Sequence, residues 1–98
     1  MKAHQLKARI LYLLSEAGGS NVKVGVTLNQ QSLGRRVTNL QAGNSRKLSV
    51  AATYTFNVDG QAYSVEQATL RELNMHRVGE WLCDVSIDYV KGAIVVSS

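Results

Sequence analysis

The residues best suited to chemistry are the arginines and lysines in the middle of the chain. Between Ala17 and Val58 there is no Asp or Glu. Residues 1–58 carry eight Lys or Arg against a single Glu, whereas residues 59–98 carry six Asp or Glu against three Lys or Arg. Such a charge split between the two halves of a chain is typical of proteins that contact nucleic acid or another charged surface.

A helix over residues 32–42 would turn its polar side chains toward solvent, and a loop containing Gly and Asn follows it. Arginine binds phosphate or guanine through its planar guanidinium, and asparagine can pair with adenine. The absence of carboxylates matters because an acidic neighbour would repel phosphate and neutralise an arginine. We therefore expect this segment to bind nucleic acid or another polyanion. The candidate binding residues are Arg35, Arg36, Asn39, Arg46 and Lys47.

A protein partner is the alternative. A basic face can be no more than a solvated face, and the net charge of +4 lies within the range that favours solubility. The same residues could dock on an acidic protein surface, including the acidic half of a second copy, as a small inhibitor, adaptor or regulatory subunit would. The uncharged segment Ala93–Ser98 could support a homodimer if it forms an edge strand. The sequence leaves the partner and the oligomeric state open.

The other reactive side chains do not combine into a catalytic or metal site. Glu72 and His76 are four residues apart, but no third ligand has matching spacing and zinc needs three or four. Asp84 and Asp88 on one strand would lie about 13 Å apart, farther than the carboxylate pairs of glycosidases. Cys83 shares one face of a predicted strand with Trp81, Val85 and Ile87, so we expect it to be buried and unreactive. We expect a protein that is not an enzyme and that has no cofactor and no metal.

The composition favours a single domain in a reducing compartment. A chain of 98 residues, of which 45% are hydrophobic, can form one core, so we expect one domain over residues 1–98. The single cysteine excludes an intramolecular disulfide. The longest apolar run near the N-terminus, Ile10–Leu14, is shorter than a secretion signal or a membrane span requires. We expect a cytoplasmic protein that does not contact a membrane.

The first part of the chain is predicted to form a helix and then a strand. Apolar residues spaced four, three and four apart predict a helix from Lys2 to Ala17 that ends at Gly18. The apolar side of this helix consists of Leu6, Ile10, Leu13 and Ala17. Over residues 21–29 the apolar residues recur with a period of two, which predicts a half-buried strand.

A second helix is predicted over residues 32–42, the segment that carries the first three candidate binding residues. Ser32 is the expected N-cap, and Gly43 is the expected end of the helix. The predicted inward side consists of Leu33, Val37 and Leu40. This arrangement is what would leave the arginines and the asparagine facing solvent.

A β-hairpin is predicted around Asp59-Gly60, because these two residues fit the centre of a type I′ turn. Residues 54–58 would pair with residues 61–65 across it. This register and the later alternation direct four aromatic side chains into the core: Tyr54, Phe56, Tyr63 and Tyr89. We therefore expect no exposed aromatic platform on which the bases of a single strand could stack.

The last part of the chain gives mixed patterns. Residues 65–77 fit either a helix or an extended segment, and the sequence leaves this open. Alternation returns over residues 81–90, and Lys91-Gly92 would turn the chain into a second hairpin. Together the elements predict an α+β fold. It would be a two-layer sandwich with a mainly antiparallel sheet of about five strands, including two β-hairpins, and two or three helices packed on one face.

Overall fold

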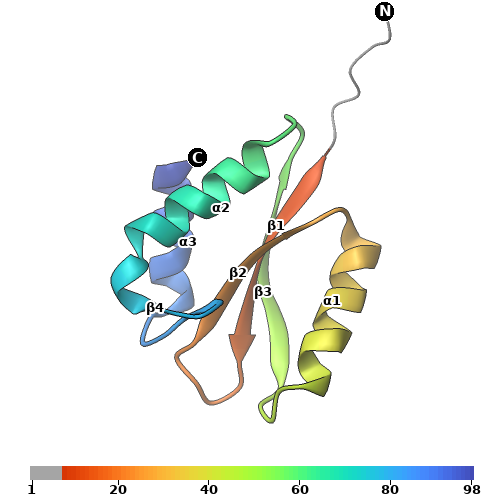
Figure 1. Ribbon diagram of the computed structural model, residues 1–98, viewed down its shortest axis with the longest axis vertical. Coiled ribbons are helices and arrows are strands. Elements are labelled where there is room, and N and C mark those ends of the chain that lie inside the picture. Colours follow the sequence, from red (N-terminus) through yellow and green to blue (C-terminus); the bar gives the residue numbers. More distant parts are fainter. Residues whose placement is uncertain (1–7) are drawn as a thin grey trace, which may run out of the picture.

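A computed structural model describes residues 8–98 of the protein (Figure 1). The chain forms a five-stranded antiparallel sheet in the order β3-β1-β2-β5-β4, together with three α-helices. The strands are β1 (Arg9–Glu16), β2 (Val22–Thr27), β3 (Leu48–Phe56), β4 (Arg77–Val78) and β5 (Trp81–Leu82). The helices are α1 (Gln30–Ala42), α2 (Gln61–Glu72) and α3 (Ile87–Ser97), with a single 3₁₀ turn at Asn74–His76. The predicted α+β class and antiparallel five-stranded sheet are confirmed.

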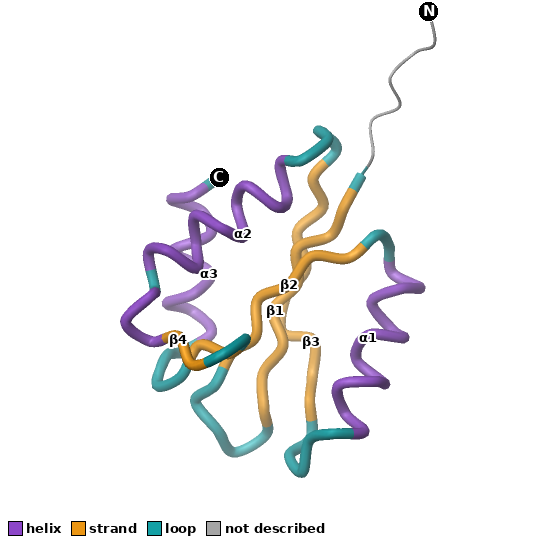
Figure 2. Tube along the Cα trace, in the orientation of Figure 1, coloured by secondary structure: helices purple, strands orange, loops and turns teal. Residues whose placement is uncertain are grey.

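The helices cover both faces of the sheet, whereas the sequence analysis placed them on one face. Figure 2 shows α1 on one side of the strands and α2 with α3 on the other. The cause is the central strand, because every residue of Ile10–Leu14 is buried and alternate side chains point to opposite faces. Ile10, Tyr12 and Leu14 pack with Leu33 of α1, while Leu11 and Leu13 belong to the larger core under α2 and α3.

The predicted first helix is wrong where the structure describes it, because residues 9–16 form β1. The expected helical segment before residue 8 lies outside the described residues. The spacing of four, three and four selected only some of the apolar residues, and Leu11, Tyr12 and Leu14 beside them are apolar too. A continuous apolar run is typical of a strand that is buried on both faces. Gly18, at a φ of +71°, lies in the turn that joins β1 to β2.

The next two elements are confirmed. Residues 22–27 form β2, although both of its faces are buried rather than one. Residues 30–42 form α1, which ends at Gly43 as predicted. The N-cap is Asn29 instead of Ser32: the Asn29 side chain accepts a hydrogen bond from Ser32 N, and the Ser32 hydroxyl accepts one from Asn29 N. This reciprocal capping box begins the helix two residues earlier than expected.

The predicted hairpin at Asp59-Gly60 is wrong, because α2 begins directly after these residues. Gly60 does adopt the left-handed conformation that the turn requires, with a φ of +81°. The buried residues that follow recur at helical spacing: the apolar Ala62, Val65 and Leu70, and Thr69, whose hydroxyl donates to the carbonyl of Val65. A helix therefore occupies the segment that was left open between helix and extended, as far as Glu72, and the 3₁₀ turn follows.

The predicted C-terminal strand is shortened and the C-terminal hairpin is replaced by a helix. Only Trp81–Leu82 is extended, and Asp84 then takes a φ of 57°. Ser86 caps α3 by accepting a hydrogen bond from Tyr89 N at 3.1 Å. The expected turn at Lys91-Gly92 thus lies inside α3. The hairpins of the structure are β1–β2 and β4–β5.

One cross-strand contact fixes how the sheet packs under α1. Tyr12 of β1 and Gly25 of β2 are register partners, and Tyr12 is completely buried. The tyrosine ring and hydroxyl lie directly over Gly25, so a Cβ added at that position would collide with them. The absence of a side chain at residue 25 is what allows the Tyr12 side chain to lie across β2.

We expect Gly25→Ala to lower the free energy of unfolding by about 1–3 kcal/mol, since the added methyl group overpacks the site. The matched control is Gly34→Ala in α1, where an added Cβ meets nothing within 4 Å. An alanine at this exposed helical position should raise the free energy of unfolding by about 0.5–1 kcal/mol. Urea unfolding of both variants measures the difference. A Gly25→Ala protein as stable as the native one would contradict the packing described here.

Candidate functional site

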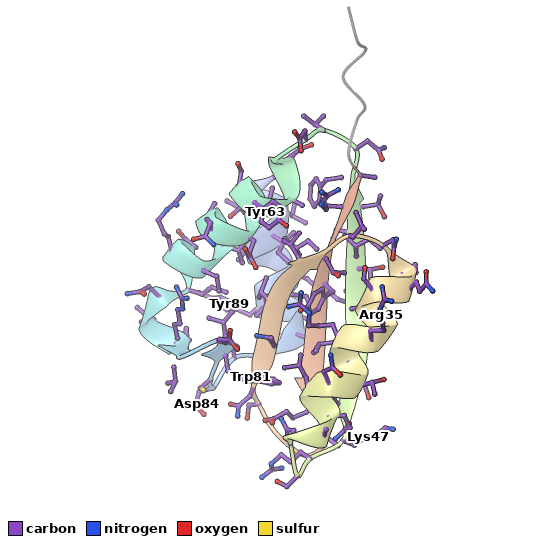
Figure 3. The ribbon with its side chains drawn as sticks, turned by 45° about the vertical axis from the view of Figure 1, so that its right-hand side comes forward. Arg35, Lys47, Tyr63, Trp81, Asp84 and Tyr89 are labelled. Atoms are coloured by element: carbon purple, nitrogen blue, oxygen red, sulfur yellow. The ribbon has the colours of Figure 1, made fainter. Side chains whose placement is uncertain are left out.

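The candidate binding residues lie on the outer side of α1 and in the loop after it. We call this set the basic surface, and all five of its side chains are exposed: Arg35, Arg36, Asn39, Arg46 and Lys47. The inner side of α1 is the predicted one, with Leu33 buried and Val37 and Leu40 packed against the same cluster. Figure 3 shows Arg35 on α1 and Lys47 beyond its end, on the opposite side of the molecule from Tyr89.

The loop that carries Arg46 and Lys47 is held by Gln41, a residue that the sequence analysis did not single out. The Gln41 amide nitrogen donates to the carbonyl of Asn44 at 3.2 Å and to that of Arg46 at 2.9 Å. Its amide oxygen accepts from Leu48 N at 2.8 Å. One side chain thus ties the end of α1 to both sides of the loop, which fixes the loop against the sheet.

A second set of contacts ties the loop to the turn between β1 and β2. Arg46 Nη1 donates to the carbonyl of Ala17 at 3.2 Å, and Ala17 N donates to the carbonyl of Lys47 at 2.8 Å. Glu16 lies at the same end of β1, but its carboxylate accepts from Asn21 and Asn44. The acidic residue of this region is therefore engaged by amides rather than by the basic surface.

No residue of the basic surface forms an ion pair with another residue of the 8–98 segment. The ion pair within that segment joins Lys23 Nζ to Glu80 Oε2 at 3.4 Å, away from the loop. Unneutralised positive charges at the surface attract phosphate most strongly where no carboxylate competes for them. The charge distribution predicted for α1 and its loop is thus retained in the folded chain.

Arg36 differs from the other basic residues because it also lines a cavity of about 200 Å³. The cavity lies between α1 and α2, beside the part of β2 that β5 does not reach, since β5 pairs only with Val22 and Lys23. We call it the Tyr12 cavity, and its polar and aromatic lining comprises Tyr12, Lys23, Arg36, Tyr63, Glu66, Gln67, Arg77 and Glu80. At this cavity, Arg36 of the basic surface therefore lies beside both positively and negatively charged side chains.

The hydroxyl of Tyr12 is buried in this region without a hydrogen-bond partner among residues 8–98. Leaving such a group unsatisfied costs roughly 1–3 kcal/mol. Burial raises the pKa of Tyr12 above its ordinary value of 10.0. The carboxylates of Glu66 and Glu80 add to this rise in pKa, whereas the charge of Arg36 and a weak hydrogen-bond interaction with its side chain oppose the rise. The phenol thus lies beside Arg36 without a hydrogen bond of ordinary length.

Two features of the cavity were missed by the sequence analysis. Tyr63 was predicted to be buried, but it lies on α2 and is 50% exposed. Tyr89 is also exposed, on α3. Helical spacing could have placed Tyr63 correctly. In a helix, the buried residues Ala62 and Val65 lie on one side, and Tyr63 does not belong to that side. Lys23 does not belong to the apolar alternation of β2, so a half-buried strand would expose it, yet its side chain is only 8% exposed.

The remaining reactive residues stay apart from this site. Asp84 lies in the turn after β5 and Asp88 in the first turn of α3, so they do not share a strand. The Nδ1 atom of His76 lies 3.1 Å from the carbonyl oxygen of Cys83. Cys83 is partly buried and not disulfide-bonded.

Comparison with known proteins assigns no family to the chain. No family model, no curated protein and no solved structure matches it. Residues 8–98 contain no helix that combines the length and the apolar character needed to cross a bilayer. The same residues bring no three His, Cys, Asp or Glu side chains together in a way that could hold a metal ion. The features with a bearing on function are the basic surface and the Tyr12 cavity beside it.

We expect Tyr12→Phe to leave the free energy of unfolding at pH 7 unchanged or to raise it by up to about 1–3 kcal/mol, because the variant removes an unpartnered buried hydroxyl. The variant should also change the response to alkali. A raised pKa means that the folded protein keeps the Tyr12 proton where the unfolded chain loses it, so native stability falls as the pH rises above about 10.

Urea unfolding between pH 8 and pH 11 measures both effects. The stability of Tyr12→Phe should fall less steeply above about pH 10 than that of the native protein, which keeps the phenol. The Tyr63→Phe variant, whose hydroxyl lies on a half-exposed side chain, serves as the matched control and should follow the native curve. Equal slopes for the native protein and Tyr12→Phe would contradict the environment described for Tyr12.

Proposed function

We propose that the protein is a small, non-catalytic binding protein of the cytoplasm that contacts nucleic acid or another polyanion through the basic surface. The observation that supports this proposal is the exposure of four cationic side chains and Asn39, none of them paired with a carboxylate within residues 8–98. The loop that presents Arg46 and Lys47 is held in place by Gln41, so binding does not have to order that loop.

Nucleic acid is the polyanion that these residue types suit best. Arginine forks onto phosphate through parallel hydrogen bonds, and each phosphate that it neutralises releases a condensed counterion. Asn39 lies four residues after Arg35 on an exposed helix, so both side chains can reach one ligand. Affinity from such contacts falls steeply as salt rises, which gives the proposal a quantitative signature.

We expect the double variant Arg35→Ala with Arg36→Ala to bind a single-stranded oligonucleotide roughly tenfold more weakly or worse at low salt. The slope of log affinity against log salt should flatten by up to about 1.4, since two phosphate contacts are lost. Fluorescence anisotropy across a salt series measures both quantities, with a duplex probe alongside.

The matched control is Arg71→Ala with Lys91→Ala, which removes the same charge from α2 and α3 on the opposite face of the sheet. This control should weaken binding much less and leave the salt slope unchanged. Equal losses in the two double variants would mean that net charge, not the basic surface, drives binding. If neither probe binds the native protein at low salt, the proposal is wrong.

A protein partner is the alternative, and the exposed apolar side chains of α3 favour it. Tyr89, Val95 and Val96 are 60%, 69% and 83% exposed. The edge strand expected at Ala93–Ser98 is wrong, because these residues lie in α3 up to Ser97. The sheet edge without charged residues is β3 instead, which pairs only with β1.

A pull-down from cell lysate, with and without nuclease, separates the two functions. We expect partners retained by the native protein to be lost after nuclease treatment, and light scattering to show no dimer. A protein that stays bound after nuclease, and that Val95→Asp with Val96→Asp releases, would assign the function to α3. A dimer that survives the same substitutions would point to β3.

A further inference from the structure

We propose that the Tyr12 cavity receives the base of an unpaired nucleotide whose phosphate lies against Arg36. This inference rests on the proposed function and narrows it to single-stranded nucleic acid. The starting observation is that Arg36 belongs both to the basic surface and to the cavity lining. A strand that runs along α1 with its phosphates on the arginines would therefore pass the mouth of the cavity.

The cavity exists because β5 is short. It pairs with Val22 and Lys23, and the rest of β2 has no strand neighbour on that side. The residues of β2 that line the space are Lys23, Val24, Gly25 and Val26. A volume of about 200 Å³ has room for roughly six water molecules. One water bonded to the tyrosine would leave most of this space unfilled, whereas a single base is a group of suitable size.

The Tyr12 hydroxyl supplies the observation that points to a ligand. Tyr12 starts on the central strand and crosses Gly25, and its hydroxyl is completely buried with no partner among residues 8–98. A ligand that enters the cavity with an acceptor or a donor can satisfy this hydroxyl, because a phenol can both donate and accept. Because the hydroxyl is covered by its neighbours, a ligand atom reaches it when side chains of the cavity wall shift aside.

The charges that line the cavity favour a base over a phosphate as its occupant. Lys23, Arg36 and Arg77 offer donors, while Glu66 and Glu80 offer acceptors. A phosphate has no donor to give to the two carboxylates and is repelled by them, whereas the N–H groups of a base can bond them. A neutral base carries both donors and acceptors along its edges and can match both kinds of group.

Tyr63 adds a surface on which a base can stack. Its ring is half exposed on α2 and lines the cavity opposite the α1 side where Arg36 lies. Stacking on an exposed aromatic side chain is the usual way in which proteins hold the bases of single strands. A base in a duplex is already stacked and paired, so it could reach this ring only after leaving the helix.

Three probes of equal length test the inference: a single-stranded oligonucleotide, the same strand with abasic sites in place of its bases, and a duplex. We expect the native protein to bind the single strand roughly tenfold more tightly than the abasic strand. Tyr12→Phe and Tyr63→Ala should each remove most of this preference and leave affinity for the abasic strand unchanged. Tyr89→Ala, which removes an exposed ring from α3, is the matched control and should keep the preference.

Equal affinity of the native protein for the single strand and the abasic strand would overturn the inference while leaving the basic surface as the binding site. Retention of the preference by both Tyr12→Phe and Tyr63→Ala would overturn it as well. Failure of the native protein to bind any of the three probes would instead reject the proposed function. Because Tyr12→Phe removes only a hydroxyl, a circular dichroism spectrum like that of the native protein and a cooperative unfolding transition at no lower urea concentration confirm that the fold is intact.

Discussion

The constraint on which the rest of the structure depends is that β1 must be buried on both faces. Its run of consecutive apolar side chains, Ile10–Leu14, has no polar side to give to solvent. Helices must therefore pack on both sides of the sheet, and α1 covers one face while α2 and α3 cover the other. As α1 needs only one apolar side to do this, its outer side is free to carry Arg35, Arg36 and Asn39.

The same strand links the core to the candidate site. Tyr12 belongs to the cluster under α1, yet its hydroxyl reaches across Gly25 to the part of β2 that β5 leaves unpaired. A side chain at residue 25 would close this path, and a longer β5 would close the cavity. The contact that stabilises the sheet under α1 therefore also shapes the site, because it places the Tyr12 hydroxyl beside Arg36 without a hydrogen bond of ordinary length.

The sequence was sufficient for elements whose pattern is contained within one segment. The period of two predicted β2, and the spacing of Leu33, Val37 and Leu40 predicted α1 together with the exposure of its arginines. Prediction failed where a local pattern fits two structures. The spacing in residues 2–17 fits a helix, but residues 9–16 form β1 because they pair with β2 and β3, which follow later in the sequence. Likewise Gly60 can turn a hairpin or precede a helix. The Tyr12 cavity could not be predicted at all, because it arises from the meeting of α1, α2 and β2.

If the outer side of α1 and the loop after it form one binding surface for a polyanion, an oligonucleotide should perturb these segments together. Amide chemical shifts of the isotopically labelled protein, followed during titration with a single-stranded oligonucleotide at low salt, measure this. We expect the largest changes in α1, in residues 43–47 and along β2 beside Tyr12, and little change in α3. Changes centred on α3 or on β3, or none at saturating oligonucleotide, would contradict it.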